Sequence, residues 1–147
     1  MSEALLSVKG LSLQIGSAGL LDRISLSIED GQCCALVGES GSGKSLTGLS
    51  LCGLWPAKAR VESEHWRFAG RSMEGLSSRA WRAQRGTGIG MIFQNPMSAL
   101  NPIKPIGEQI AEGLRLRLGL DRRRARMESI AWLERLAVPD AERRYRQ

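Results

Sequence analysis

The chain has 147 residues, of which 42% are hydrophobic and 24% charged, and its formal net charge is +6. This length fits one domain or a part of one, and the apolar content excludes a disordered chain. No apolar run approaches the ~20 residues that span a bilayer. The N-terminal stretch MSEALLSVKG contains an acidic residue and strand-like alternation, which argues against a signal peptide. We therefore expect a globular, soluble-type chain without a transmembrane segment.

The first part of the chain predicts three strands. Residues 5–15 alternate apolar and polar positions, residues 16–19 form a Gly-Ser-Ala-Gly turn, and residues 24–28 alternate again before Glu-Asp-Gly. Residues 33–37 (CCALV) are a short apolar run that predicts a buried strand. The cysteines at 33, 34 and 52 lack zinc-ligand spacing, and we interpret them as small core residues of a protein from a reducing compartment.

Residues 38–45, GESGSGKS, match the phosphate-binding pattern G-x-x-x-x-G-K-[ST] in full. The loop follows the predicted strand and precedes residues 46–52, whose apolar spacing predicts a helix, and this is the context that the pattern requires. Its glycines would let backbone N–H groups point at phosphates. Lys44 would reach the β- and γ-phosphates, and the hydroxyl of Ser45 would bind Mg²⁺. The residues that we expect to contact the nucleotide here are Gly38, Glu39, Ser40, Gly41, Ser42, Gly43, Lys44, Ser45 and Thr47.

The rest of the chain continues to alternate strands and helices. Residues 60–70 predict a strand with Trp66 and Phe68 on one face, and residues 77–85 predict a short basic helix capped by Ser77 or Ser78. Residues 87–93 (TGIGMIF) predict a second buried strand, and residues 95–105 hold three prolines and predict a structured loop. Two helices are predicted at 106–118 and 122–137, separated near Gly119, and the chain restarts at Val-Pro-Asp, residues 138–140.

Residues 93–102, FQNPMSALNP, closely resemble the Q-loop of ATP-binding cassette (ABC) transporter ATPases, particularly the dipeptide, oligopeptide and nickel importers. Residues 31–45 are similar to the same subfamily, and the resemblance covers essentially the whole chain in the right order. It implies an α/β P-loop NTPase (ABC ATPase) fold, with an N-terminal antiparallel β-subdomain and the start of an α-helical subdomain. The expected organisation is an ATP-binding core at 1–94 and a partial helical subdomain at 95–147.

The resemblance also assigns roles to single residues. Gln94 corresponds to the family's Q-loop glutamine, which senses Mg²⁺ and the attacking water beside the γ-phosphate, and a neutral amide suits this task because it both donates and accepts hydrogen bonds. Gln94 and Ser45 are thus the expected Mg²⁺-site residues, and ATP and Mg²⁺ the expected cofactors. Ile15 stands where the family places an aromatic residue that stacks on adenine, so we expect weakened stacking there. We interpret Trp55 and Trp66 as packing residues.

The function implied by the resemblance is ATP-driven uptake of peptides or nickel at the cytoplasmic face of the inner membrane. The implied partners are a second ABC ATPase subunit in a homo- or heterodimeric sandwich, permease subunits that contact residues 95–105, and, indirectly, an extracytoplasmic substrate-binding protein. The sequence contains no LSGGQ-like signature, no Walker B carboxylates and no switch histidine, since His65 lies too far upstream. The last residues, ERRYRQ, resemble the segment before the signature. We therefore expect a truncated domain that binds ATP but does not hydrolyse it at a useful rate alone.

The C-terminal third is rich in arginine, which allows three interpretations: a nucleic-acid surface, a solvated helix face, or a surface near anionic lipid headgroups. No basic motif interleaved with aromatic residues is present, so we expect no specific nucleic acid. Two alternative functions stay open, a soluble ABC-type ATPase acting on nucleic acid or ribosomes and a non-catalytic nucleotide-binding module; the Asn-Pro…Leu-Asn-Pro run favours the importer. The arginines are Arg115, Arg117, Arg122, Arg123, Arg124, Arg126, Arg135, Arg143, Arg144 and Arg146.

Overall fold

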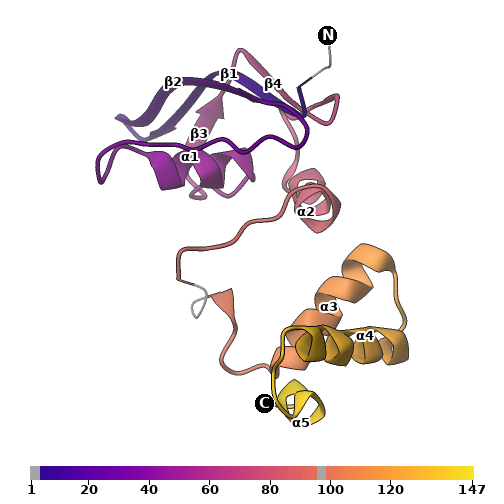
Figure 1. Ribbon diagram of the computed structural model, residues 1–147. Coiled ribbons are helices and arrows are strands. Elements are labelled where there is room, and N and C mark those ends of the chain that lie inside the picture. The colour runs from indigo at the N-terminus through magenta and orange to yellow at the C-terminus, as the bar shows by residue number, and fades with distance from the viewer. Residues whose placement is uncertain (1–3, 96–98) are drawn as a thin grey trace. The chain divides into compact units, whose positions relative to one another are not determined.

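The structure is a computed structural model that describes residues 4–95 and 99–147. The chain divides into two units, Met1–Trp81 and Arg82–Gln147 (Figure 1). Residues 96–98 of the predicted Q-loop motif lie outside the described residues. The functional boundary that we predict after residue 94 falls inside the second unit and stays a prediction.

A five-stranded antiparallel sheet forms the frame of the first unit. The central strand β1 pairs with β2 on one side and with β3 and β4 on the other, and β5 extends the sheet from β4. The β1–β2 hairpin turns tightly, because Ile15 pairs with Ala18 across Gly16 and Ser17, and Gly16 has a φ of +60°. The two predicted N-terminal strands are confirmed, the second being longer than predicted. The strands are β1 (Leu6–Ile15), β2 (Ala18–Ile28), β3 (Ala59–Glu62), β4 (His65–Phe68) and β5 (Arg71–Ser72).

The predicted strand at 60–70 is present as two strands that run along β1 one after the other. Val61 of β3 lies opposite Leu13, and Trp66 of β4 lies opposite Val8. Between them the backbone N–H of Glu64 donates to the carbonyl of Lys9 at 2.9 Å. β3 and β4 together thus pair with β1 along nearly its whole length. The pairing is interrupted near an irregular part of β1.

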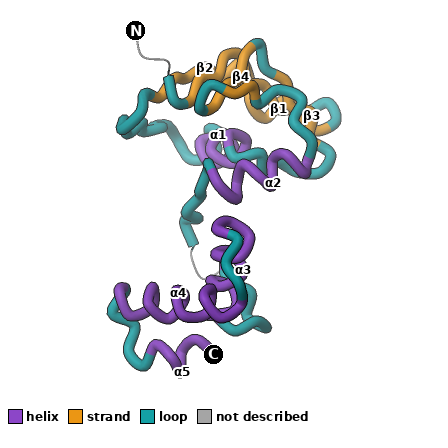
Figure 2. The backbone as a smooth tube through the Cα atoms, turned by 90° about the vertical axis from the view of Figure 1, so that its right-hand side faces the viewer, coloured by secondary structure: helices purple, strands orange, loops and turns teal. Residues whose placement is uncertain are grey.

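The core of the first unit lies between the sheet and the helix α1 (Lys44–Leu51), which runs beside one face of the sheet (Figures 1 and 2). Three indole rings pack together, since the ring centroids of Trp55, Trp66 and Trp81 lie 5.2 to 6.4 Å apart. Trp66 is only 3% exposed, which agrees with its interpretation as a packing residue. The other buried apolar residues of this unit are Val8, Leu11, Leu13, Leu21 and Met73.

Two predicted strands are not formed. Residues 33–37 and 88–93 carry no strand, and Thr87 instead ends the helix α2 (Ser78–Thr87). Val37 is 93% exposed and Ile92 95%, and Cys33 and Cys34 are exposed rather than buried in a core. The reason is that a strand exists only through hydrogen bonds to a neighbouring strand, and within residues 4–95 and 99–147 no strand pairs with either segment.

Helices make up the second unit. The predicted helices are confirmed as α3 (Ile106–Leu118) and α4 (Arg122–Arg135), and a short helix that we did not predict, α5 (Ala141–Tyr145), follows them. Their core contains Leu133, Ala141 and Tyr145, with Ile110, Ile130 and Val138 packed against it.

Helix ends follow local chemistry. Gly119 ends α3 in the left-handed conformation at a φ of +64°, and the carboxylate of Asp121 accepts from the backbone N–H of Arg124 at the start of α4. For α2, the hydroxyl of Ser77 accepts from the backbone N–H of Ala80 at 3.3 Å, which confirms a serine cap. Among the described residues, no helix is both long enough and apolar enough to cross a membrane.

Candidate nucleotide-binding site

The glycine-rich loop directly precedes α1, and both lie within the first unit. The strand predicted before the loop is not formed, so the helix alone is present of the strand–loop–helix context that the pattern requires. Its backbone closes on itself where the N–H of Ser42 donates to the carbonyl of Glu39 at 3.2 Å. Gly41 and Gly43 have φ values of +84° and +86°, a region that a side chain makes costly. The local conformation thus favours glycine at position 43, which the pattern fixes, and at position 41, which the pattern leaves open.

Gly43 joins the loop to the helix. Its carbonyl accepts from both the backbone N–H of Thr47 at 2.7 Å and the Thr47 hydroxyl at 3.0 Å. A Cβ atom on Gly43 would lie 2.9 Å from Cδ2 of Leu21, so the loop also packs closely against β2. The start of α1 has no side-chain cap, which leaves its first backbone N–H groups directed toward the loop.

Lys44 folds back into the loop that precedes it. Its ammonium donates to the carbonyls of Gly38 and Glu39 at 2.7 and 2.5 Å and lies 3.3 Å from the hydroxyl of Ser42. The three donors of a lysine ammonium therefore all have acceptors from the loop itself. The positive charge lies among backbone groups at the mouth of a helix N-terminus, where a phosphate would find both attraction and hydrogen-bond donors.

The hydroxyl groups of the remaining loop residues differ in whether a ligand can reach them. Ser40 and Ser45 are exposed, so the Ser45 hydroxyl is accessible as an oxygen ligand. Thr47 is 4% exposed, and its hydroxyl supports the loop from inside. Its predicted contact with nucleotide stays a prediction.

The two predicted site residues outside the loop belong to different parts of the chain. Ile15 ends β1, is half-buried and pairs with Ala18 and Ala59. Gln94 is exposed and lies in the second unit, whereas the phosphate loop lies in the first. The roles assigned to Ile15 and Gln94 stay predictions.

The oxygen ligand that the loop offers, the Ser45 hydroxyl, fits a metal ion that binds together with a triphosphate. Within the described part of the chain, no three His, Cys, Asp or Glu side chains come together as a metal site. The hydroxyl of Ser45 is one hard oxygen ligand of the kind Mg²⁺ takes, and a triphosphate supplies others.

From the sequence, Ser42 is expected only as one of several loop residues that contact the nucleotide. In the structure its hydroxyl lies beside the Lys44 ammonium, and a Cβ atom on Gly38 would approach that hydroxyl to 2.9 Å. Gly38 has no positive φ, and its missing side chain leaves room for the Ser42 hydroxyl in this rotamer. The pattern alone does not reveal this, because it accepts any residue at position 42.

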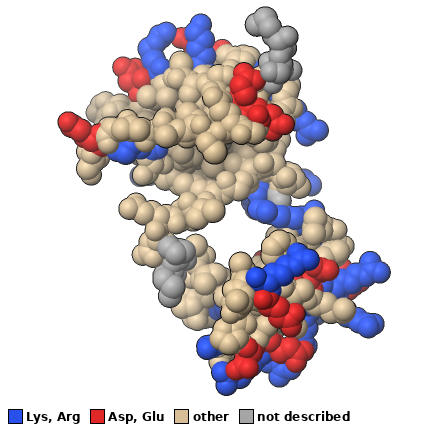
Figure 3. All heavy atoms as spheres, in the orientation of Figure 1, with Lys and Arg blue, Asp and Glu red and all other residues tan. Residues whose placement is uncertain are grey.

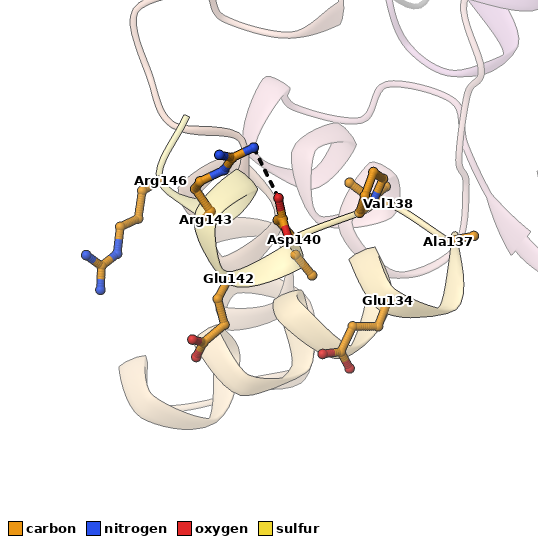
Figure 4. Close-up of a pocket in the computed structure, with 9 residues that line it drawn as sticks. Glu134, Ala137, Val138, Asp140, Glu142, Arg143 and Arg146 are labelled. Atoms are coloured by element: carbon orange, nitrogen blue, oxygen red, sulfur yellow. Dashed lines mark ion pairs between the residues drawn. The ribbon is translucent and has the colours of Figure 1, made fainter.

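A hollow of about 1,010 Å³ lies elsewhere, between the end of α4 and α5 (Figure 4). Its lining mixes Glu134, Glu142 and Arg146 with Arg143 and Asp140, which form an ion pair at 3.1 Å. The hollow is open and belongs to the second unit, so we do not assign it to the nucleotide.

The sequence pattern of the ABC transporter family matches residues 21–147. The chain is 37% identical to the dipeptide transport ATP-binding protein DppD of Escherichia coli, over 93% of this chain and 43% of that protein. It is 37% identical to DppD of Haemophilus influenzae, over 96% of this chain and 44% of that protein. It is 41% identical to the glutathione import ATP-binding protein GsiA of Pectobacterium atrosepticum, over 80% of this chain and 20% of that protein.

The chain therefore spans less than half the length of these curated relatives. The antiparallel sheet, the glycine loop and the helices agree with part of an α/β ABC ATPase, the fold that the resemblance implies. From the match over residues 21–147, the chain belongs to the ABC transporter family.

Proposed function

We propose that this chain is the phosphate-binding part of an ATP-binding subunit that powers an ABC importer. The observation that carries the proposal is the loop around Lys44, in which two left-handed glycines, a free helix N-terminus and one ammonium surround the same place. In this proposal the triphosphate of ATP binds there with its Mg²⁺.

When the triphosphate binds, phosphate oxygens replace loop carbonyls as hydrogen-bond acceptors of the Lys44 ammonium. Carbonyls of Gly38 and Glu39 hold the Lys44 ammonium in place, and charged phosphate oxygens are stronger acceptors than neutral carbonyls. The loop backbone then turns its N–H groups to the phosphates while the helix N-terminus contributes its partial positive charge. In this proposal Ser45 supplies a hydroxyl to Mg²⁺, and Gln94 orients water by its neutral amide.

The importer assignment rests on the relatives and on the Q-loop resemblance. Two of these relatives are named for dipeptide transport and one for glutathione import. We propose a peptide or nickel importer, with a second ATPase subunit, permease subunits that contact residues 95–105 and an extracytoplasmic binding protein as partners, at the cytoplasmic face of the inner membrane.

Within this proposal, the 147 residues bind ATP without turning it over, because they contain no Walker B carboxylates to hold the metal and activate water. Purified chain should therefore release no phosphate from MgATP above background. Turnover at a rate typical of the family would contradict this part of the proposal, while leaving nucleotide binding untouched.

The direct test compares Lys44→Ala with Lys58→Ala by calorimetric titration of MgATP. Lys58 is exposed and outside the loop, so its variant removes the same charge elsewhere. We expect Lys44→Ala to weaken binding by about 10- to 100-fold, since charge-assisted hydrogen bonds are worth about 1.5–3 kcal/mol. Lys58→Ala should bind like the parent chain. Equal affinities in the two variants would refute the assignment of the loop.

A further inference from the structure

The net charge of the chain resides in one unit. Residues 82–147 contain thirteen Lys and Arg and seven Asp and Glu, whereas residues 1–81 contain eight of each. The second unit therefore carries the whole excess of +6. Basic side chains are spread over this unit among acidic ones in Figure 3. An excess of positive charge attracts anions. The contacts of the individual arginines show which of them are available to bind an anion.

Several arginines of the second unit are engaged by acidic neighbours or backbone. Arg143 pairs with Asp140 at 3.1 Å, the side chain of Arg124 lies 3.8 Å from Asp121, and Arg117 donates to the carbonyl of Arg85. Within residues 4–95 and 99–147, Arg122 and Arg126 have no ion pair and no hydrogen bond to a carboxylate. Their positive charges are not neutralised locally.

These two arginines line one pocket of about 330 Å³ between α3, α4 and α5. Arg115 of α3 lines it from the opposite helix, and Glu108 contributes one negative charge. Arg115 also lies near Glu112, whose pKa is lowered mainly by its hydrogen bond to Lys104 and, to a smaller extent, by Arg115. The lining thus has three guanidinium groups against one carboxylate, with Ala111 and Tyr145 as its other members.

Tyr145, which forms one wall of this pocket, packs against α3 on its other side. The tyrosine is 8% exposed, and a Cβ atom on Gly107 would lie only 2.0 Å from its ring. The backbone N–H of Ile106 donates to the carbonyl of Gln147 at 2.7 Å, which ties α3 to the end of α5. The Arg126 guanidinium lies over the tyrosine ring, 5.4 Å from its centroid, so the ring positions this arginine.

We propose that this pocket is a second anion site, which binds a phosphate monoester or diphosphate group between Arg122, Arg126 and Arg115. Guanidinium groups are planar forks that match phosphate oxygens in pairs, and three of them on two helices can enclose one group. Glu108 makes the site selective for a ligand whose charge is concentrated enough to outweigh one carboxylate. The proposal is independent of the nucleotide site, which lies in the other unit.

Tyr145 provides a probe at the site, because it is the only tyrosine in the chain. The full chain labelled with 3-fluorotyrosine gives a single fluorine NMR signal from the pocket wall. We place the label in the Lys44→Ala variant, so that phosphates bound at the glycine loop do not contribute. The titrants are inorganic pyrophosphate for a soluble source, and phosphatidylcholine vesicles with and without phosphatidic acid for a lipid source.

We expect a saturable change of the Tyr145 signal with one of the two phosphate sources. A change with pyrophosphate identifies a soluble phosphate ligand. A change only with vesicles that contain phosphatidic acid identifies a lipid headgroup. If neither source changes the signal, the proposal is wrong.

Charge variants then locate the binding. Arg122→Gln/Arg126→Gln should weaken it about tenfold or more, because two charge-assisted contacts are lost. Arg123→Gln/Arg135→Gln removes two other positive charges from α4, outside the pocket, and should change the affinity less than threefold. Glu108→Gln removes the negative charge of the pocket and should strengthen binding. Equal weakening in both double variants would overturn the proposal in favour of diffuse charge attraction. No weakening in Arg122→Gln/Arg126→Gln would show that the anion binds at another site.

Discussion

At the scale of single residues, the glycine loop is held by backbone conformation as much as by side chains. Gly43 combines a φ of +86° with a close approach to Leu21, so two independent constraints fall on one position. Lys44 depends on this geometry, because its ammonium reaches Gly38 and Glu39 only if the loop folds back over the helix start.

We therefore predict that Gly43→Ala weakens MgATP binding and lowers the free energy of unfolding by about 1–2 kcal/mol, the cost of a left-handed residue with a Cβ atom. The matched control is Gly48→Ala inside α1, the helix that Gly43 precedes, where a Cβ atom meets nothing within 4 Å. That variant should gain about 0.5–1 kcal/mol from helix propensity. Chemical denaturation and calorimetry on both variants check this, and equal effects of the two would contradict it.

At the scale of elements, the helices of the second unit pack through a glycine. Gly107 lies in the first turn of α3, and the space that its missing side chain leaves is filled by the ring of Tyr145 from α5. A residue 38 positions away in the sequence thus determines what can stand at position 107. The contact holds the short α5 against α3, since a helix of this length is not stable by itself.

We predict that Gly107→Ala destabilises the second unit by about 1–3 kcal/mol, the usual cost of overpacking a filled core. Gly113→Ala, in the same helix but with open space around its Cβ position, should be neutral or slightly stabilising. Hydrogen exchange of the α5 amides distinguishes the two variants, because only Gly107→Ala should release them. Retained α5 protection in Gly107→Ala would show that the tyrosine contact is not what holds α5.

At the scale of the whole molecule, each unit exposes apolar residues in a segment that we expected to be a buried strand. Val37 is 93% exposed in the first unit, and Ile92 is 95% exposed in the second. Extended apolar segments with free backbone groups tend to pair with other chains.

The isolated chain should therefore bind the dye ANS and self-associate as its concentration rises. Val37→Thr/Ile92→Thr should reduce both signals, because threonine keeps the branched Cβ of both residues and replaces apolar surface with a hydroxyl. Val37→Ile/Ile92→Val keeps the apolar character and is the control. Light scattering and dye fluorescence measure the effect, and identical behaviour of the two double variants would exclude these segments as the cause.

Much of the local structure could be predicted from the sequence. The β1–β2 hairpin, the loop at 38–45, the serine cap of α2 and the ends of α3 at Gly119 all follow from residues within a few positions of each other. Hydrogen bonds in helices and caps connect near neighbours, so the residues that decide them are adjacent in the chain. The roles of Gln94 and Ile15 rest on family resemblance and stay predictions.

By itself the sequence determined the conformation of the glycine loop, since its glycines, lysine and following helix are one continuous segment whose hydrogen bonds are local. Only the tertiary structure decided that residues 33–37 are not a strand, because an apolar pattern cannot supply the neighbour with which a strand must pair. It also decided the arginine pocket, since Arg115 of α3 and Arg122 and Arg126 of α4 line one pocket only through the packing of their helices. Contacts between distant segments depend on packing, and a pattern read along the chain does not contain them.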